Sequence, residues 1–369
     1  MHAQPDRDHS HASAPMLADI RRQAATLGEV HARREAIGTF AEINLRPGKA
    51  GRTHIFGSGD GWFAARAALT GTQQGQAHSG LDFVLNVAPT LTADDRAVAI
   101  SMSGNVDRTL EGAQIAQARG ARLSVLTNGQ GGRLGALGDA LHSLDIPDIA
   151  PFLCGTSSYT ATLATLQLAF ASLDPRSRFP AALGALLTAL PGFIEEADRF
   201  ARSVAERAGS AFPGARFLGV GASVATADYG AAKFVEVTKI PAWSDDIEEF
   251  AHRQYWGMQT SEIVVLLPLD EGSARYADAT ADALSDLGIL TIALEPQGAG
   301  VPSASARLAL PGDGRTVGIT QAIALQLLAY HLGFASGTDP NRREHLKNDQ
   351  ARFSVSRKLT RRSLLGTGQ

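Results

Sequence analysis

Residues 97–129 read AVAISMSGNVDRTLEGAQIAQARGARLSVLTNG, and in them two short apolar runs flank a segment with helical spacing. Both runs are rich in Val, Leu, Ile or Ala and end at small or polar residues, which is typical of strands. Between them the apolar residues recur at intervals of three and four positions, as on one face of a helix. The order strand, helix, strand favours a βαβ unit with parallel strands and hence an α/β fold.

The same pattern occurs elsewhere in the chain. Residues 53–61, THIFGSGDG, form an apolar run that enters a glycine-rich turn, and residues 82–88, DFVLNVA, are interpreted as a further strand. The turn at 53–61 is echoed by residues 215–223, ARFLGVGAS. Residues 262–296, EIVVLLPLDEGSARYADATADALSDLGILTIALEP, echo the stretch 97–129. An order of elements that recurs in this way indicates an internal repeat.

The repeat predicts two α/β domains of one fold, at residues 45–175 and 213–330. The other segments are expected to be a flexible tail (1–15), an N-terminal helical segment (16–44), a helical connector (176–212), and a C-terminal strap and tail (331–369).

Composition limits the classes of function. Hydrophobic residues make up 44% and charged residues 19% of 369 residues, and the formal net charge is −3, so nothing favours nucleic acid or an anionic membrane as a partner. The basic C-terminal segment has no interleaved aromatic residues and no helix-turn-helix pattern. The single cysteine, Cys154, fits a reducing compartment. With neither a signal-peptide-like stretch nor a run of about 18 apolar residues, we expect a cytoplasmic protein.

One loop has the features of an anion site. Residues 100–105, ISMSGN, follow an expected strand and precede an expected helix, so Ser101 and Ser103 offer hydroxyls beside a helix N-terminus while Gly104 allows close backbone approach. The alternative is an ordinary serine-capped turn. The corresponding residues 266–272, LLPLDEG, lack the serines and carry two acids. This asymmetry favours a specialised site in the first half.

Other phosphate-binding motifs are excluded. In FGSGDGW (56–62), Trp62 stands where a dinucleotide fingerprint needs its third glycine. The segment RPGKAGR (46–52) has neither the following Ser or Thr nor the spaced glycine of a nucleoside-triphosphate loop. The remaining candidate ligand is a small molecule that carries a phosphate, sulfonate or similar group.

Residues 233–252, KFVEVTKIPAWSDDIEEFAH, allow three interpretations. A carboxylate-bridged metal site would use Glu249 and His252, but it needs a second Glu-x-x-His, which the sequence lacks. A solvated acidic helix start, capped by Ser244 or Asp245, fits the run of acids.

The third interpretation of residues 233–252 is a proton-transfer pair. Glu236 lies in an apolar helical stretch, where partial burial raises the pKa of a carboxylate and suits a base. A histidine such as His252 suits proton transfer to or from a sugar oxygen at neutral pH.

The two-repeat layout, the ISMSGN loop and the Glu-to-His arrangement resemble the tandem sugar-isomerase (SIS) domain family. This family includes the isomerase half of glucosamine-6-phosphate synthase and the fructosamine-6-phosphate deglycases. The resemblance covers about residues 50–350 and implies two doubly wound parallel-sheet domains in tandem. It also implies a homodimer with its sites at the subunit interface.

The resemblance assigns roles to individual residues. Glu236 matches the family's catalytic glutamate, His252 its ring-opening histidine sixteen residues later, and Lys347 a substrate-binding lysine in the C-terminal strap. The residues that match the family's substrate and phosphate contacts are Gly59, Ser101, Met102, Ser103, Thr156, Ser158 and Lys233.

The implied activity is aldose–ketose isomerisation or deamination of an anionic sugar through a cis-enediol or enolamine, without metal or cofactor. No glutaminase activity is expected. Gly61 and Val106 replace hydroxyl residues that are frequent in the family, so the choice between a phosphate and a sulfonate stays open. The alternatives are a fructosamine-6-phosphate deglycase, an isomerase of a sulfonated sugar, and a non-catalytic protein that binds sugar phosphates.

Overall fold

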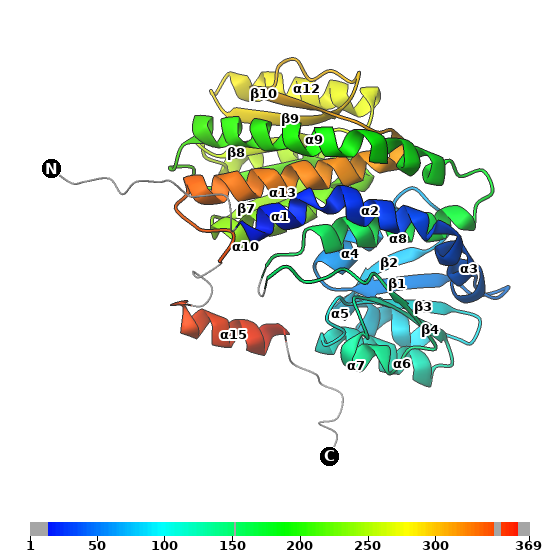
Figure 1. The fold of residues 1–369 in the computed structure, drawn as a ribbon. Helices are drawn as coiled ribbons and strands as arrows, with labels where there is room; N and C mark the ends of the chain where they lie inside the picture. Colours follow the sequence, from blue (N-terminus) through cyan, green and yellow to red (C-terminus); the bar gives the residue numbers. More distant parts are fainter. Residues whose placement is uncertain (1–13, 151–152, 343–347, 361–369) are drawn as a thin grey trace.

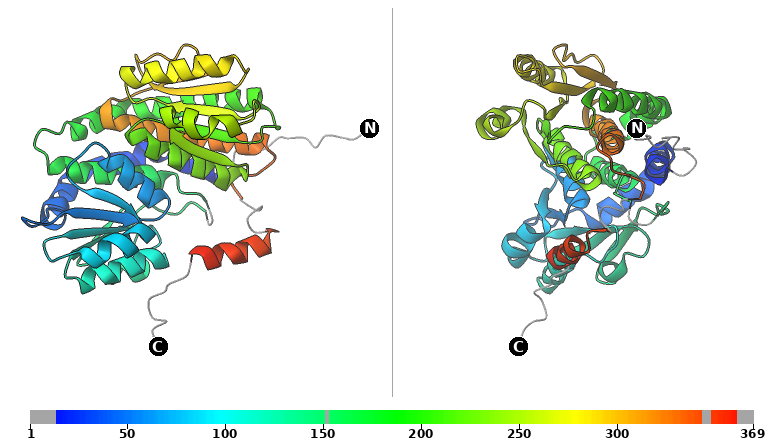
Figure 2. Two further views of the ribbon diagram at one scale, coloured as in Figure 1. Left: turned by 180° about the vertical axis from the view of Figure 1, so that it is seen from behind. Right: turned by 90° about the vertical axis from the view of Figure 1, so that its left-hand side faces the viewer.

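The computed structural model describes residues 14–150, 153–342 and 348–360, which form two parallel five-stranded sheets. Figures 1 and 2 show the sheets toward opposite ends of the molecule, with long helices between them. The first sheet comprises β1 (Thr53–Gly57), β2 (Gln76–Ser79), β3 (Arg96–Ile100), β4 (Arg122–Thr127) and β5 (Ala140–Ser143). The second comprises β6 (Ala215–Gly219), β7 (Ala242–Asp246), β8 (Ile263–Leu267), β9 (Leu290–Pro296) and β10 (Ala306–Leu310).

The two sheets have the same topology. The strand order is β2-β1-β3-β4-β5 in the first sheet and β10-β9-β8-β6-β7 in the second, and every pairing is parallel. When the second order is read from β7, the strands β7-β6-β8-β9-β10 correspond in turn to β2-β1-β3-β4-β5. The α/β class and the tandem repeat are thus confirmed. In this topology the chain reverses direction across the sheet between β1 and β3, and ligands of such folds bind beyond the carboxyl ends of the strands at that point.

Helices cover both sheets. Those before and within the first half are α1 (Pro15–Arg21), α2 (Gln23–Ala32), α3 (Arg34–Asn44), α4 (Asp60–Leu69), α5 (Gly80–Asp82), α6 (Asp107–Ala118), α7 (Gly132–Gly135) and α8 (Ser157–Ser172). Those that follow are α9 (Phe179–Ala208), α10 (Ala222–Thr238), α11 (Ile247–Arg253), α12 (Glu271–Ser285), α13 (Val317–Ala335) and α15 (Gln350–Thr360). Shorter helical turns are η2 (Phe83–Val87), η3 (Ala88–Thr90), η4 (Tyr255–Gly257) and η5 (Gly314–Thr316).

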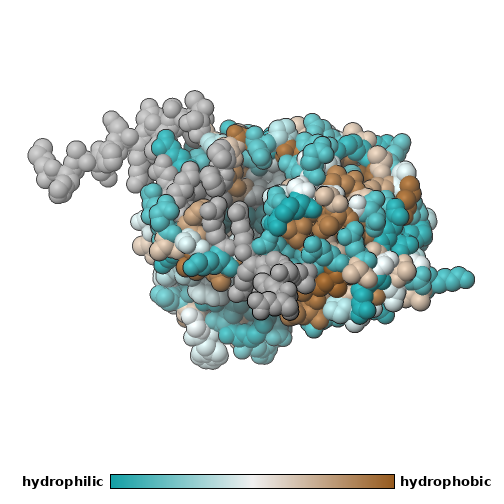
Figure 3. Space-filling view, turned by 90° about the horizontal axis from the view of Figure 1, so that it is seen from below, coloured by the Kyte–Doolittle hydropathy of each residue, from teal (hydrophilic) through white to brown (hydrophobic). Residues whose placement is uncertain are grey.

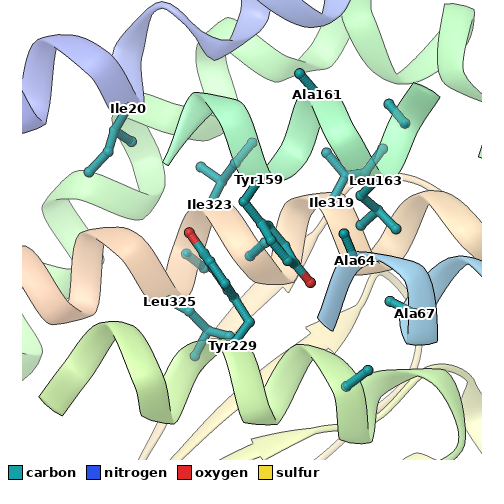
Figure 4. Packing of buried hydrophobic residues seen from close by; sticks show 14 of the residues in the cluster. Ile20, Ala64, Ala67, Tyr159, Ala161, Leu163, Tyr229, Ile319, Ile323 and Leu325 are labelled. Carbon is teal, nitrogen blue, oxygen red and sulfur yellow. The ribbon is translucent and has the colours of Figure 1, made fainter. Parts of the chain in front are cut away.

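The largest hydrophobic core lies between the two sheets. Helix α10 contacts both α4 and α13, and α4 contacts α8, so the halves share this core. At its centre the rings of Tyr159 and Tyr229 stack 3.6 Å apart at 10° (Figure 4). Two large aromatic side chains bury much apolar area in one contact, so the stacked rings link α8 to α10.

Helix α13 is among the most apolar elements. Within the described part of the chain, the helical stretch Gly314–Ala335 is the one helix long and apolar enough to cross a membrane, and 89% of its apolar 18-residue window is buried inside the molecule. A core helix satisfies the same criteria.

Figure 3 shows a face of the molecule on which hydrophilic residues surround small hydrophobic patches.

The prediction of a strand at residues 82–88 is wrong. Residues 82–88 form the end of α5, the π-helical turn η2 and the start of η3 rather than a strand. Ser79 caps this segment by accepting a hydrogen bond from the backbone of Asp82. The ring of Phe83 stacks on Phe56 at 3.8 Å, so the apolar side chains reach the core from a helix. The second strand is instead β2, a short polar segment just before it.

The described segments before, between and after the two sheets are largely helical. The N-terminal segment is helical, as α1 to α3, and α9 occupies most of the expected connector. Helix α13 continues to Ala335, so the expected boundary at 330 falls inside a helix. Residues 1–13 of the expected tail at 1–15 lie outside the described residues, as does Lys347, and α1 begins at Pro15 within that tail.

Candidate active site

A cavity opens where the carboxyl end of β1 meets α10 of the other half. Its volume is about 830 Å³. The residues that line it come from the start of α4, the loop before α8, helix α10 and strand β7: Gly59, Asp60, Phe63, Gly155, Ala231, Ala232, Lys233, Val235, Glu236, Ala242, Trp243 and Ser244. Of the predicted site residues, the fold brings Gly59, Lys233 and Glu236 together here, although 174 positions separate Gly59 from Lys233.

The turn before α4 depends on glycine. Gly59 has φ 56° and ψ −127°, a conformation that disfavours any side chain, and it lies at the N-cap of α4. Gly221 has nearly the same angles, φ 56° and ψ −120°, at the N-cap of α10. The same turn therefore starts the first helix of each repeat. In the first half it places Asp60 at the cavity.

Three charged side chains form a row across the cavity wall. Lys233 Nζ lies 2.6 Å from Glu236 Oε2 and 3.0 Å from Asp60 Oδ2. The Lys233 side chain is 4% exposed, whereas those of Asp60 and Glu236 are 28% and 30% exposed. The ammonium is therefore buried, while both carboxylates remain accessible from the cavity.

The row fixes the charge state of Lys233. Burial works to lower the pKa of Lys233, but the Asp60 and Glu236 carboxylates outweigh it and hold that pKa above its ordinary range. The ammonium in turn favours the ionised form of Glu236. Glu236 is thus presented to the cavity as a carboxylate, which is the form needed by a general base.

The sequence reasoning missed Asp60 and the contribution of β7. The signal for Asp60 was the asymmetry between the repeats, since Ala222 follows the equivalent glycine in the second half. The residues of β7, AWSDD, were expected to lead into a helix, and a strand with exposed and acidic residues gives little sequence signal.

The ISMSGN loop lies at the neighbouring carboxyl end of β3 but does not line this cavity. Ser101 is buried, and its hydroxyl has no hydrogen-bond partner among the described residues. Ser103 is exposed and accepts a hydrogen bond from the backbone of Asn105. Gly104 has φ 63°, and a Cβ there would collide with the carbonyl oxygen of Gly131. Met102 packs against the main core.

The CGTSSYT segment lies beside Asp60. A Cβ atom on Gly155 would lie 2.5 Å from Asp60 Oδ2 and 3.1 Å from Ser158 Oγ, so only glycine fits between them. The Thr156 hydroxyl donates to the Asp19 carboxylate of α1. Asp19 also accepts from the backbone of Ser157 at 3.0 Å and so caps α8 from another helix. Neither Thr156 nor Ser158 lines the cavity.

His252 lies outside the cavity in this single chain. It is on α11, its side chain is 66% exposed, and its Nε2 is 3.4 Å from Glu248 Oε1. The expected helix cap is corrected, because Asp246 rather than Ser244 or Asp245 caps α11, by accepting from the backbone of Glu248.

Ser244 and Asp245 lie in β7 instead.

Within the described ranges, no three His, Cys, Asp or Glu side chains are grouped so as to hold a metal ion.

Comparison with known proteins identifies the repeat. The SIS domain matches residues 63–172 and 215–336, more than half of the chain. Among curated proteins, a glutamine–fructose-6-phosphate aminotransferase (isomerizing) from Pyrobaculum aerophilum is 25% identical over 261 residues, which are 69% of this chain and 43% of that protein. The chain therefore spans less than half the length of that relative.

Solved structures share the fold across both halves. The C-terminal domain of glucosamine-fructose-6-phosphate aminotransferase from Francisella tularensis superposes with a TM-score of 0.72 at 16% identity, covering 88% of this chain and 97% of that one. A tagatose-6-phosphate ketose/aldose isomerase from Escherichia coli gives 0.70 at 20% identity, covering 88% and 94%. A glucosamine-6-phosphate deaminase from Thermotoga maritima gives 0.69 at 16% identity, covering 89% and 97%. At these identities the likeness establishes the fold.

Proposed function

The chain belongs to the SIS domain family, and from that premise we propose that it is an enzyme of the phosphosugar isomerase or deaminase type. Its substrate would be a sugar phosphate or a similar anionic sugar. Relatives named as an isomerase, a deaminase and an isomerizing aminotransferase of hexose 6-phosphates share its fold or sequence, which supports this class.

The observation that carries the proposal is the Lys233–Glu236 pair. A carboxylate held ionised by a buried ammonium, and open to a cavity of about 830 Å³, suits removal of a carbon-bound proton. The cavity also lies next to the switch point of the first sheet, where α/β folds bind ligands.

The chemistry proposed for an aldose follows from this arrangement. Glu236 removes the proton from C2, the electrons of that C–H bond form the C1–C2 double bond, and the electrons of the C1–O1 double bond move to O1, which gives a cis-enediolate. Glu236 then returns the proton to C1 while the O2 proton passes to O1, which gives the ketose. Lys233 orients the Glu236 carboxylate and stabilises its negative charge before the first proton transfer and after the second.

Other residues are proposed for the anionic end of the substrate. Ser101 and Ser103 lie at the end of β3 before the N-terminus of α6, where hydroxyls and backbone amides favour an anion. Gly59, which follows the neighbouring strand β1, permits close approach of the ligand to the backbone. Met102, Thr156, Ser158 and Lys347 remain predicted contacts, and the Thr156 hydroxyl would have to leave Asp19 to act as one.

A second subunit is proposed to complete the site. His252 is exposed and outside the cavity of its own chain, so a homodimer could bring it to the cavity of the other chain for ring opening. Val235 and Trp243 line the cavity yet are 41% and 42% exposed. Exposed apolar residues at the mouth of a site suit coverage by a partner.

A second candidate is a deglycase that acts on an amine-bearing sugar. Asp60 adds a carboxylate to the cavity, so the charged residues that line it, among those described, sum to −1. That charge favours a protonated amine on the substrate. The same Glu236 would then form an enolamine before the carbon–nitrogen bond breaks.

Proton NMR in deuterated water tests the proposal. The protein is incubated with hexose, hexosamine and fructosamine 6-phosphates, and the C1 and C2 protons are followed. Deuterium uptake with a new ketose or aldose supports an isomerase, and release of free amine supports the second candidate. Binding without exchange for every compound would point to a non-catalytic protein, and neither binding nor exchange would direct the search to sulfonated sugars.

A further inference from the structure

The Lys233 ammonium is shared between two carboxylates, only one of which belongs to its own helix. We propose that Asp60 is a positioning residue that keeps Glu236 a strong base by holding the opposite side of the Lys233 ammonium. This inference deepens the proposed function and rests on it for its catalytic meaning. The electrostatic effect of Asp60 on Glu236 follows from the geometry alone, whatever reaction the protein catalyses.

The chain is shaped to hold a carboxylate at this position. Gly59 turns the backbone so that Asp60 begins α4 facing the cavity, and Gly155 leaves the space that the carboxylate fills. The second repeat makes the same turn at Gly221 and continues with Ala222. The turn and the helix therefore do not require an acid at this position.

The sign of the effect follows from the charges. The Lys233 ammonium favours the ionised form of Glu236, whereas the Asp60 carboxylate offsets part of that positive charge and repels a second carboxylate nearby. Asp60 therefore raises the proton affinity of Glu236, and its removal lowers that affinity. A weaker base removes a carbon-bound proton more slowly once it is fully ionised.

Four other titratable groups lie near the row but do not line the cavity. Arg66 of α4 and Asp228 of α10 pair with each other, and Asp228 also accepts from Ser244 of β7 at 2.6 Å. The Cys154 thiol lies on the loop before α8, and Lys239 follows the last turn of α10. The residues that carry these groups and lie outside the lining of the cavity are Arg66, Cys154, Asp228 and Lys239.

Arg66 and Asp228 provide a matched control for a merely structural role. Their ion pair also joins α4 to α10 across the two halves, as the Asp60–Lys233 pair does. Asp228→Asn removes a carboxylate from the same helix contact without touching the row in the cavity. A simple tether would make both substitutions act on stability alone.

The test compares the pH dependence of deuterium exchange in the wild type, Asp60→Asn and Asp228→Asn. We expect Asp60→Asn to move the acid limb of the pH–rate profile to lower pH by about one unit and to lower the plateau rate, because removal of the Asp60 charge lowers the proton affinity of Glu236. Asp228→Asn should leave the acid limb in place. The proposal is overturned if the acid limb of Asp60→Asn lies within about 0.2 pH units of the wild-type acid limb.

A second measurement is independent of catalysis. The carboxyl ¹³C shift of Glu236, assigned by its absence in Glu236→Gln, is titrated in the wild type and in Asp60→Asn. A lower midpoint in Asp60→Asn supports the coupling even if no substrate exchanges, in which case only the proposed function fails. Equal midpoints overturn the inference whatever the activity.

Discussion

Lys233 and Glu236 lie one turn apart on α10, with Lys233 Nζ 2.6 Å from Glu236 Oε2. The ammonium is buried and the carboxylate reaches a cavity, so one helix supplies both a proton acceptor and the charge that fixes it. The other half of the molecule supplies Gly59, Asp60, Phe63 and Gly155 to the lining of the cavity. Catalysis by this pair would therefore depend on the packing of the two repeats against each other.

Gly155→Ala should impair the site more than the fold. Its new Cβ would lie 2.5 Å from Asp60 Oδ2, so the carboxylate or the loop must move. We expect a loss of about 1–3 kcal/mol in the free energy of unfolding and at least roughly a tenfold loss of exchange rate. Urea denaturation and the NMR assay measure these changes.

Gly28→Ala is the matched control for Gly155→Ala. Gly28 lies within α2, and no atom lies within 4 Å of the place that an added methyl group would occupy, so alanine should stabilise the helix by about 0.5–1 kcal/mol. If Gly155→Ala behaves like this control, the space at Gly155 does not matter for Asp60.

His54 and His78 should make the protein less stable in mild acid. Their rings share a hydrogen bond of 3.1 Å between Nδ1 of His54 and Nε2 of His78. Burial, and for His54 also the charge of His78, lowers the pKa of each histidine below the ordinary 6.5. Below pH 6.5 the unfolded chain then binds more protons than the folded one, so stability is lost as the pH falls toward the folded-state pKa values.

Urea denaturation at pH 7.5 and pH 5.5 checks the histidine pair. Each unit of lowered pKa corresponds to about 1.4 kcal/mol. The wild type should lose more stability between the two pH values than a His54→Gln/His78→Gln double variant. Equal losses would show that other groups dominate the acid response.

Mixing two inactive variants should restore activity if His252 acts across a dimer. Glu236→Gln and His252→Ala homodimers each lack one group at both sites. A heterodimer has one site with both groups intact, so statistical mixing should restore about a quarter of wild-type activity. Activity that stays at the level of the separate variants would place His252 in its own subunit's site or outside catalysis.

The sequence predicted the parallel sheets because short apolar strands, glycine turns and helical spacing occur in the same order twice. It failed at residues 82–88, where apolar side chains serve a helical turn just as well as a strand. The sequence marks Asp60 only by its contrast with Ala222 in the second repeat, and it does not reveal the contact with Lys233, which is 173 residues away. The distance of His252 from the cavity depends on how β7 and α11 are placed, which its spacing from Glu236 does not reveal.

Glu236 is the residue on which the proposed chemistry depends, as the proton carrier. The decisive measurement is the deuterium exchange rate of Glu236→Gln on whichever sugar the wild type exchanges fastest, with Glu249→Gln, an exposed glutamate of α11, as the control. We expect Glu236→Gln to lose on the order of 10²–10⁴-fold, the usual contribution of a general base, and Glu249→Gln to match the wild type. Wild-type exchange in Glu236→Gln would contradict the assignment of Glu236 as the base.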